Sequence, residues 1–104
     1  MGTLKIEHRH DLDAADARAR IEALGDYLHN KYSLDVAWNG DVASIHGKFM
    51  IVTIDGTVKL EPGKVVFEGK DPGMLWRGKA KDYLGHKLGK YLDPQTPAEA
   101  LPRR

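Results

Sequence analysis

The chain contains no cysteine, so disulfide bonds and thiolate metal sites are excluded. No apolar run approaches the ~20 residues needed to span a bilayer, and no secretory signal pattern opens the chain. The formal net charge is only +1, which argues against a dedicated nucleic-acid-binding protein. We therefore expect a cytoplasmic protein with no transmembrane segment and no nucleic-acid partner.

The composition is typical of one globular domain. Apolar residues make up 41% and charged residues 30% of the 104 residues. A chain of this length forms a single domain with a modest core. We place this domain at residues 1–92. Residues 93–104 contain three prolines and are predicted to be a disordered or frayed tail.

Two amphipathic helices are predicted, each with start and stop signals. The first begins after the N-cap residue Asp13 and ends near Tyr32. The second begins after Asp71-Pro72-Gly73 and ends at Asp93-Pro94. Each helix carries an apolar stripe at helical spacing. The stripes comprise Ala14, Ala17, Ile21, Leu24, Leu28 and Tyr32 in the first helix, and Trp76, Ala80, Tyr83, Leu84, Leu88 and Tyr91 in the second.

Alternation of apolar and polar residues predicts five strands, the first at residues 3–9 and the longest within residues 49–60. Turn signals at Asn39-Gly40, Gly47-Lys48 and Pro62-Gly63 separate the last four strands. All three turns keep the same apolar side chains on one face. We expect a longer loop of the same parity at Pro62, because proline cannot adopt a positive φ. The predicted cross-strand pairs include Trp38 with Asp41, Ile45 with Met50, and Leu60 with Val65.

The element order is therefore β-α-β-β-β-β-α, an α+β fold. We predict an antiparallel meander sheet with both helices packed on one face. The sequence does not determine where the first strand joins the sheet, and its helical crossover allows a parallel partner.

The sheet face without helices is predicted to carry an apolar patch. The predicted registers place four apolar residues there, namely Val42, Phe49, Ile51 and Val66. Such a patch usually marks a partner surface, so we predict a sheet-to-sheet homodimer. The alternative is that scattered apolar residues on a solvated face are normal.

The second helix is aromatic, basic and rich in glycine. Its candidate surface-binding or partner-binding residues are Trp76, Lys79, Lys81, Tyr83, Lys87, Lys90 and Tyr91. They are typical of a helix that binds an anionic or apolar interface, although a solvated face with snorkelling lysines explains them equally well. Gly78, Gly85 and Gly89 share one flank, where each costs about 1 kcal/mol of helix propensity. They indicate either close approach by another helix or marginal helix stability.

No catalytic or metal-binding constellation stands out. His8 and His10 share a strand face next to Asp11, but no third ligand has suitable spacing. We expect no metal and no cofactor. The chain has no nucleophile elbow, P-loop or dinucleotide fingerprint, so an enzyme is the weakest interpretation.

Short motifs at three places carry a family resemblance. They are His10-Asp11-Leu12 before a helix containing Ala17-Arg18, Trp38-Asn39-Gly40-Asp41 at a hairpin, and Asp55-Gly56-Thr57 in the long strand. On these motifs, residues 4–92 resemble the bacterial family of putative polyhydroxyalkanoic acid system proteins. The chain departs from the pattern in a longer segment between Asp41 and Asp55, and in Asp71-Pro72-Gly73 with Trp76 before the last helix. The resemblance implies association with the storage-polyester system and supplies no catalytic residues.

We therefore expect a non-enzymatic module that associates with polyhydroxyalkanoate granules or granule proteins. The alternative is a carrier that binds a small hydrophobic, acyl-type ligand between a curved sheet and the second helix. In that alternative, Gly56, Gly69 and the helix glycines would leave room for the ligand.

Overall fold

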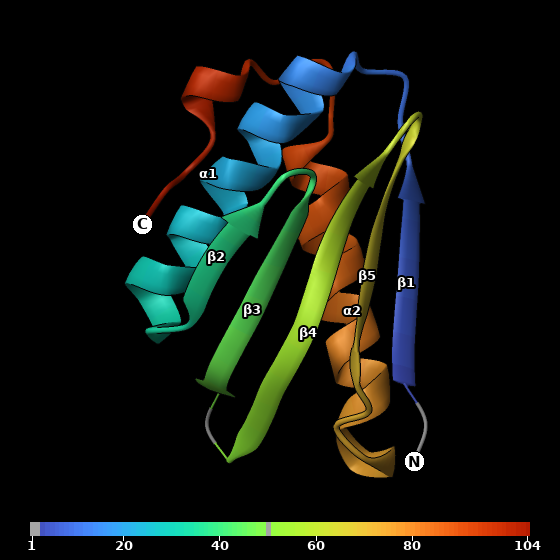
Figure 1. The fold of residues 1–104 in the computed structure, drawn as a ribbon, viewed down its shortest axis with the longest axis vertical. Coiled ribbons are helices and arrows are strands. Elements are labelled where there is room, and N and C mark those ends of the chain that lie inside the picture. The colour runs from blue at the N-terminus through green and yellow to red at the C-terminus, as the bar shows by residue number, and fades with distance from the viewer. Residues whose placement is uncertain (1–2, 50) are drawn as a thin grey trace.

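The structure is a computed structural model and describes residues 3–49 and 51–104. Its helices and strands follow the predicted order (Figure 1). They are β1 (Thr3–Arg9), α1 (Ala14–Tyr32), β2 (Asp35–Asn39), β3 (Val42–Phe49), β4 (Val52–Glu61), β5 (Lys64–Lys70), α2 (Met74–Tyr91) and a short 3-10 helix (Ala98–Ala100).

The five strands form one antiparallel sheet in the order β1-β5-β4-β3-β2. Both helices cover the same face of the sheet, while the other face carries no helix (Figure 1). The predicted α+β fold is confirmed. β1 joins the sheet at its edge, antiparallel to β5, so the parallel pairing left open by the sequence does not occur.

α1 starts and stops as its end residues predict. The side chain of Asp13 accepts a 2.8 Å hydrogen bond from the backbone N–H of Asp16. At the other end, Ser33 adopts the left-handed conformation with φ of 61°, and its N–H bonds the carbonyl of His29. The middle of the helix's apolar stripe is buried, as at Ala17 and Leu24, whereas Ala14 at its start is exposed.

The first hairpin differs from its prediction by two residues. Asn39 pairs with Val42 and Trp38 with Ala43, so the two turn residues are Gly40 and Asp41. Gly40 has a φ of 61°, which glycine adopts without steric cost. A shift by an even number of residues leaves each side chain on its predicted face.

The second hairpin corrects the predicted turn at Gly47-Lys48. β3 continues to Phe49, which pairs with Val52, and Lys48 pairs with Thr53. The predicted pairing of Ile45 with Met50 involves a residue outside those described, and Ile45 instead faces Gly56. Because β3 is longer than predicted, alternation places the Phe49 side chain on the helix-covered face together with that of Ile45.

The third hairpin has the predicted register but a shorter loop than expected. Leu60 pairs with Val65 and Glu61 with Lys64, which leaves only Pro62 and Gly63 in the turn. Gly63 has a φ of 76°. Proline followed by a glycine of positive φ suits a type II turn, so a longer loop is not needed.

The tail, expected to be frayed or disordered, packs against the domain in the structure. Residues 93–104 return along α1 (Figure 1). Leu101 is only 4% exposed and belongs to the hydrophobic core. The Tyr91 hydroxyl donates a hydrogen bond to the carbonyl of Pro102, and Arg103 pairs with Asp26. These contacts attach the tail to both helices.

Candidate functional site

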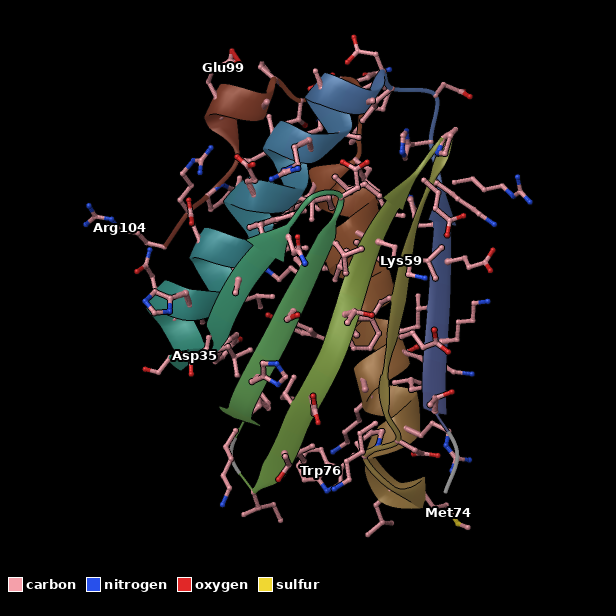
Figure 2. The ribbon with its side chains drawn as sticks, viewed as in Figure 1. Asp35, Lys59, Met74, Trp76, Glu99 and Arg104 are labelled. Atoms are coloured by element: carbon pink, nitrogen blue, oxygen red, sulfur yellow. The ribbon has the colours of Figure 1, made fainter. Side chains whose placement is uncertain are left out.

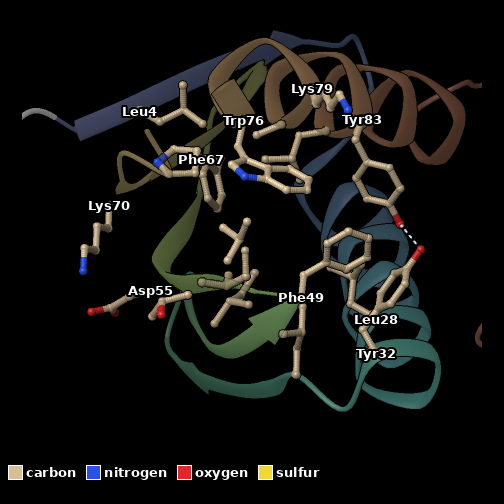
Figure 3. A pocket seen from close by; sticks show the side chains of 18 residues that line it. Leu4, Leu28, Tyr32, Phe49, Asp55, Phe67, Lys70, Trp76, Lys79 and Tyr83 are labelled. Carbon is tan, nitrogen blue, oxygen red and sulfur yellow. Dashed lines mark hydrogen bonds between the residues drawn. The ribbon is translucent and has the colours of Figure 1, made fainter. Parts of the chain in front are cut away.

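A cavity of about 270 Å³ lies between the sheet and the N-terminal half of α2 (Figure 3). Ile45, Ile54 and Phe67 of three neighbouring strands form its floor. Trp76 and Ala80 of α2 form its roof. Almost all of the lining is apolar, and such a cavity suits an apolar ligand.

An aromatic cluster closes one side of the cavity. The ring centroid of Phe49 lies 4.6 Å from that of Tyr32 and 6.4 Å from that of Tyr83. The Tyr83 hydroxyl donates a 3.2 Å hydrogen bond to the Tyr32 hydroxyl, drawn as a dashed line in Figure 3. Burial, reinforced by this hydrogen bond, raises the pKa of Tyr83. The Tyr83 hydroxyl, neutral at pH 7 like any tyrosine, therefore stays protonated into the alkaline range as well, and this side of the cavity carries no charge from it.

A cross-strand pair of glycines leaves room for the Phe67 ring in the floor of the cavity. Gly56 on β4 lies opposite Gly69 on β5. A Cβ atom at Gly56 would lie 2.9 Å from the carbonyl oxygen of Glu68 and 3.1 Å from the Phe67 ring. An aromatic ring across paired glycines replaces the packing that their missing side chains leave out. The two glycines thus make room for Phe67, whereas the sequence predicted that they make room for a ligand.

Three charged residues border the cavity, namely Asp55, Lys70 and Lys79, and all three are exposed. Figure 3 shows Asp55 and Lys70 on one side of the cavity and Lys79 on the other. By strand alternation, the side chains of Asp55 and Lys70 belong to the outer face of the sheet. Asp55 Oδ1 lies 3.0 Å from Nδ1 of His46, and Lys79 Nζ lies 5.3 Å from the centroid of the Trp76 ring. The cavity therefore has an apolar interior and exposed charged residues at its border.

The roof of the cavity is the weaker end of α2. The helix begins after Gly73, which has a φ of 100° and supplies no side-chain cap. Met74 and Leu75 in the first turn are 85% and 86% exposed. A Cβ added at Gly78 or Gly85 would meet no atom within 4 Å, so neither glycine permits close approach by another helix. These glycines instead lower the stability of the roof.

The residues predicted as a binding surface on α2 are Trp76, Lys79, Lys81, Tyr83, Lys87, Lys90 and Tyr91. Trp76 and Tyr83 face the cavity, and Tyr91 is completely buried. By contrast, Lys81 and Lys90 are exposed to solvent. Lys79 and Lys87 lie beside aromatic rings, with their Nζ atoms 5.3 Å and 5.7 Å from the ring centroids of Trp76 and Tyr83. The aromatic rings therefore face the protein interior, and only some of the lysines border them.

The four residues predicted to form a dimer face are not brought together. Phe49 lies on the helix-covered side, in the aromatic cluster of the cavity. Val66 lies on the outer face, opposite Lys59, but is only 5% exposed. Val42 is half-buried, and Ile51 lies in the β3–β4 connection, 81% exposed. The outer face is consequently less apolar than predicted.

Two of the motifs that carry the family resemblance meet on α1. The Arg18 guanidinium lies 4.1 Å from the centroid of the Trp38 ring and donates a 2.8 Å hydrogen bond to the carbonyl of Gly40. In the loop before α1, His10 Nδ1 accepts a hydrogen bond from the N–H of Leu12. None of these residues lines the cavity. Their contacts give the motifs a structural role, because Arg18 attaches the β2–β3 hairpin to the helix and His10 fixes the conformation of the loop before it.

The described part of the chain lacks two kinds of feature, a cluster of metal ligands and a membrane-spanning helix. Residues 3–49 and 51–104 contain no group of three or more His, Asp or Glu side chains that could hold a metal ion. Within the same residues, no helix is long and apolar enough to cross a membrane.

Sequence reasoning missed Lys70, Phe67 and Ile54 as parts of the site. The available signal was the short Ala80 within the aromatic stripe of α2, since a small residue between Trp76 and Tyr83 leaves space beneath the helix. None of the three helix glycines that were expected to create this space lines the cavity.

One family model matches most of the chain. It is described as "Putative polyhydroxyalkanoic acid system protein" and matches residues 4–95. No curated protein and no solved structure matches the chain. The match agrees with the resemblance seen in the sequence. The chain belongs to the family of putative polyhydroxyalkanoic acid system proteins.

Proposed function

We propose that this domain binds a small acyl-type ligand in the cavity between the sheet and α2, and that it acts as a carrier in the polyhydroxyalkanoate system. The apolar cavity is the observation that supports binding. Family membership supports the cellular context. The monomers of this polyester are hydroxyacyl units, so the context and the lining point to the same ligand chemistry.

The cavity volume suits a medium-length chain. An apolar cavity of about 150 Å³ holds benzene, which has six carbon atoms. In the same proportion, the cavity of about 270 Å³ has room for roughly ten carbon atoms. A ligand of that size is much smaller than a polymer chain, and a carrier would hold one acyl unit at a time.

The loosely held roof supplies a route for the ligand. The first turn of α2 lacks a side-chain cap, and Gly78 weakens the next turn. Elements with few buried contacts open more readily than the rest of a fold. Opening of this half of α2 would expose the floor around Phe67 while the C-terminal half, held by buried Leu88 and Tyr91, stays in place.

Fluorescence titration tests the proposal directly. In a Trp38→Phe background, Trp76 in the cavity wall is the single tryptophan, since the chain has two. We expect 1-decanol to change its emission with saturation. Ala80→Phe fills the cavity and should abolish this response. The matched control, Ala37→Phe on the exposed outer face of β2, should retain it. Equal binding by both variants would rule out the cavity as the site.

A second candidate function is adsorption to the granule surface. Ile51, Met74 and Leu75 are each more than 80% exposed. The β3–β4 connection and the first turn of α2 lie at the same end of the molecule, where Figure 2 labels Met74 and Trp76. Apolar side chains exposed together at one end are typical of an interaction site.

Co-sedimentation with protein-stripped polyhydroxybutyrate granules tests this second function. Anionic liposomes and bare polystyrene serve as controls for non-selective adsorption. We expect selective retention by the polyester, and its loss in the triple variant Ile51→Ser, Met74→Ser, Leu75→Ser. Because these side chains are exposed, the variant should keep its fold. Retention of the variant at the wild-type level would exclude this end as the adsorbing surface.

A further inference from the structure

β1 forms one edge of the sheet and pairs with β5 on one side only. It is the terminal strand in the sheet order, and Figure 1 shows no element of the described chain beyond it. An edge strand presents a row of backbone N–H and C=O groups that can pair with another strand. The open side of β1 can therefore accept a further strand.

The residues with outward backbone groups follow from one hydrogen bond beyond the end of β1. The N–H of His10 donates to the carbonyl of Gly63 at 3.0 Å, in the same register as the rest of the β1–β5 ladder. Hydrogen-bonded pairs alternate along an antiparallel ladder, so the even-numbered residues of β1 bond β5 and the odd-numbered residues point outward. The outward residues are Thr3, Lys5, Glu7 and Arg9, and all four are exposed.

The charges of β1 match those of a second copy of the same strand. Antiparallel pairing about a two-fold axis at Ile6 covers the whole strand and places Lys5 opposite Glu7 of the other copy. The symmetric registers centred on Lys5 or on Glu7 would place like charges opposite each other. Opposite charges across two strands stabilise the pair, and like charges destabilise it. The charge pattern therefore favours the register centred on Ile6.

Ile6 adds an apolar contact at the centre of this pairing. Its side chain is half-buried and packs against the hydrophobic core on the helix-covered face. At the axis, the two Ile6 residues form a non-hydrogen-bonded pair, in which Cα atoms lie about 4.5 Å apart and side chains are close. The pairing therefore covers apolar surface that one copy leaves accessible.

The opposite edge of the sheet, β2, is less suited to such pairing. The N–H of Leu60 donates to the carbonyl of Asp41 at 2.9 Å, which sets the alternation on this side of the sheet. It leaves only Val36 and Trp38 of β2 with outward backbone groups, and neither side chain is charged. β1 is the longer edge and the one whose charges select its own copy.

We propose that two copies of this chain associate through their β1 strands, antiparallel and centred on Ile6, to form one continuous sheet. The two-fold axis is perpendicular to the sheet, so both helical layers and both cavities lie on the same side. This edge-to-edge dimer differs from the face-to-face dimer predicted from the sequence. Its contact is one strand edge wide, so the dimer is transient, with a dissociation constant in the micromolar range.

Single charge reversals test the register by sedimentation velocity over a concentration series. Lys5→Glu and Glu7→Lys each replace attractive cross-strand pairs by repulsive ones, and the symmetry repeats every contact. We expect the wild type to dimerise as its concentration rises, and each variant to dimerise at least about tenfold more weakly. The matched control, Lys59→Glu on the exposed outer face of β4, should dimerise like the wild type.

A mixture of the two variants tests the same contact without relying on a loss. Each chain supplies the charges that the other lacks, so Lys5→Glu and Glu7→Lys chains together should form a mixed dimer at least as stable as the wild-type dimer. Such recovery also shows that both variants are folded. A wild type that stays monomeric up to about 1 mM, single variants that dimerise as it does, or a mixture without recovery would each overturn the proposal.

Amide hydrogen exchange measured by NMR identifies the edge that forms the contact. The N–H groups of Lys5 and Glu7 should exchange rapidly at low protein concentration and become protected as the concentration rises. The outward N–H of Trp38 on β2 is the internal control and should not change. Protection that increases at Trp38 and not at Lys5 would place the contact at the other edge and overturn the β1 interface.

Discussion

At the scale of single residues, Arg20 joins two segments that are distant in the sequence, its own helix α1 and the end of α2. Its side chain is 3% exposed, and its Nε donates a 2.9 Å hydrogen bond to Asp16. Its Nη1 donates to the carbonyls of Tyr91 at 3.2 Å and of Asp93 at 2.8 Å. A buried cation at the C-terminal end of a helix also suits the helix dipole. Arg20 thus attaches the end of α2 to α1.

We expect Arg20→Met to reduce the free energy of unfolding by about 2–3 kcal/mol. The substitution keeps the alkyl volume but leaves the buried carbonyl of Tyr91 without its donor. Urea denaturation measures the change. Arg9→Met provides the control, because Arg9 is exposed and should change stability by less than about 0.5 kcal/mol. Similar effects of the two substitutions would contradict a capping role for Arg20.

The raised pKa of Tyr83 predicts that the free energy of unfolding decreases at alkaline pH. Burial and the Tyr32 hydrogen bond raise the pKa of Tyr83 above its ordinary 10.0. A group with a raised pKa in the folded state contributes stability that is complete below about pH 10 and is lost as the pH rises further. We expect urea denaturation to show a larger loss of stability between about pH 9 and pH 11.5 in the wild type than in Tyr83→Phe.

Tyr27 provides a control for this experiment, because its pKa is lowered and its effect on alkaline stability is opposite to that of Tyr83. A hydrogen bond with Lys31 is the largest cause that lowers the pKa of Tyr27. Its ionisation therefore favours the folded state as the pH rises, and Tyr27→Phe should steepen the alkaline loss. Identical pH profiles for the wild type and both variants would contradict the assignment.

At the scale of elements, α2 is firmly held at one end only. Leu88 and Tyr91 are its buried residues, and both lie in the C-terminal half. The N-terminal half combines the missing cap with Gly78, where an added Cβ would meet no atom within 4 Å. A helix with this distribution opens from its N-terminus, which is the half that roofs the cavity.

We expect Gly78→Ala and Gly85→Ala each to stabilise the protein by up to about 1 kcal/mol, because alanine has the higher helix propensity and a Cβ meets no neighbour. Hydrogen exchange should show greater protection in α2, and ligand association should slow if this half must open. Gly40→Ala is the control, since its φ of 61° makes a side chain unfavourable. No added protection in α2 would show that the glycines do not limit its stability.

The three hairpins show which features of the sheet are determined by the local sequence. Alternation determines the face of each side chain, so every predicted register kept the correct parity except beyond Gly47. The position of a turn depends on distant contacts as well. β3 extends to Phe49 because the Phe49 ring packs with Tyr32 of α1 and Tyr83 of α2. No local signal in the strand specifies those partners.

At the scale of the whole molecule, the cavity depends on how two layers fit together. The helices and strands, their order and the common face of both helices are evident from periodicity and end signals. The volume left between Phe67 and Ala80 is not, because it depends on the distance of α2 from the sheet. The same limit applies to β1, whose place beside β5 is determined by tertiary packing. Sequence reasoning therefore predicted a carrier as an alternative but misplaced the residues that create its space.

The C-terminal tail tests whether long-range contacts override local composition. Its prolines predict a disordered end, yet Leu101 is buried and the Tyr91 hydroxyl bonds Pro102. Removal of residues 97–104 should reduce the free energy of unfolding by about 3 kcal/mol, from the lost burial of Leu101 and the lost hydrogen bond. Removal of Arg104 alone, an exposed residue, should have no effect. Urea denaturation could instead find both truncated forms as stable as the full chain. That result would mean that the tail contributes nothing to the stability of the fold and behaves as the disordered end that its prolines predict.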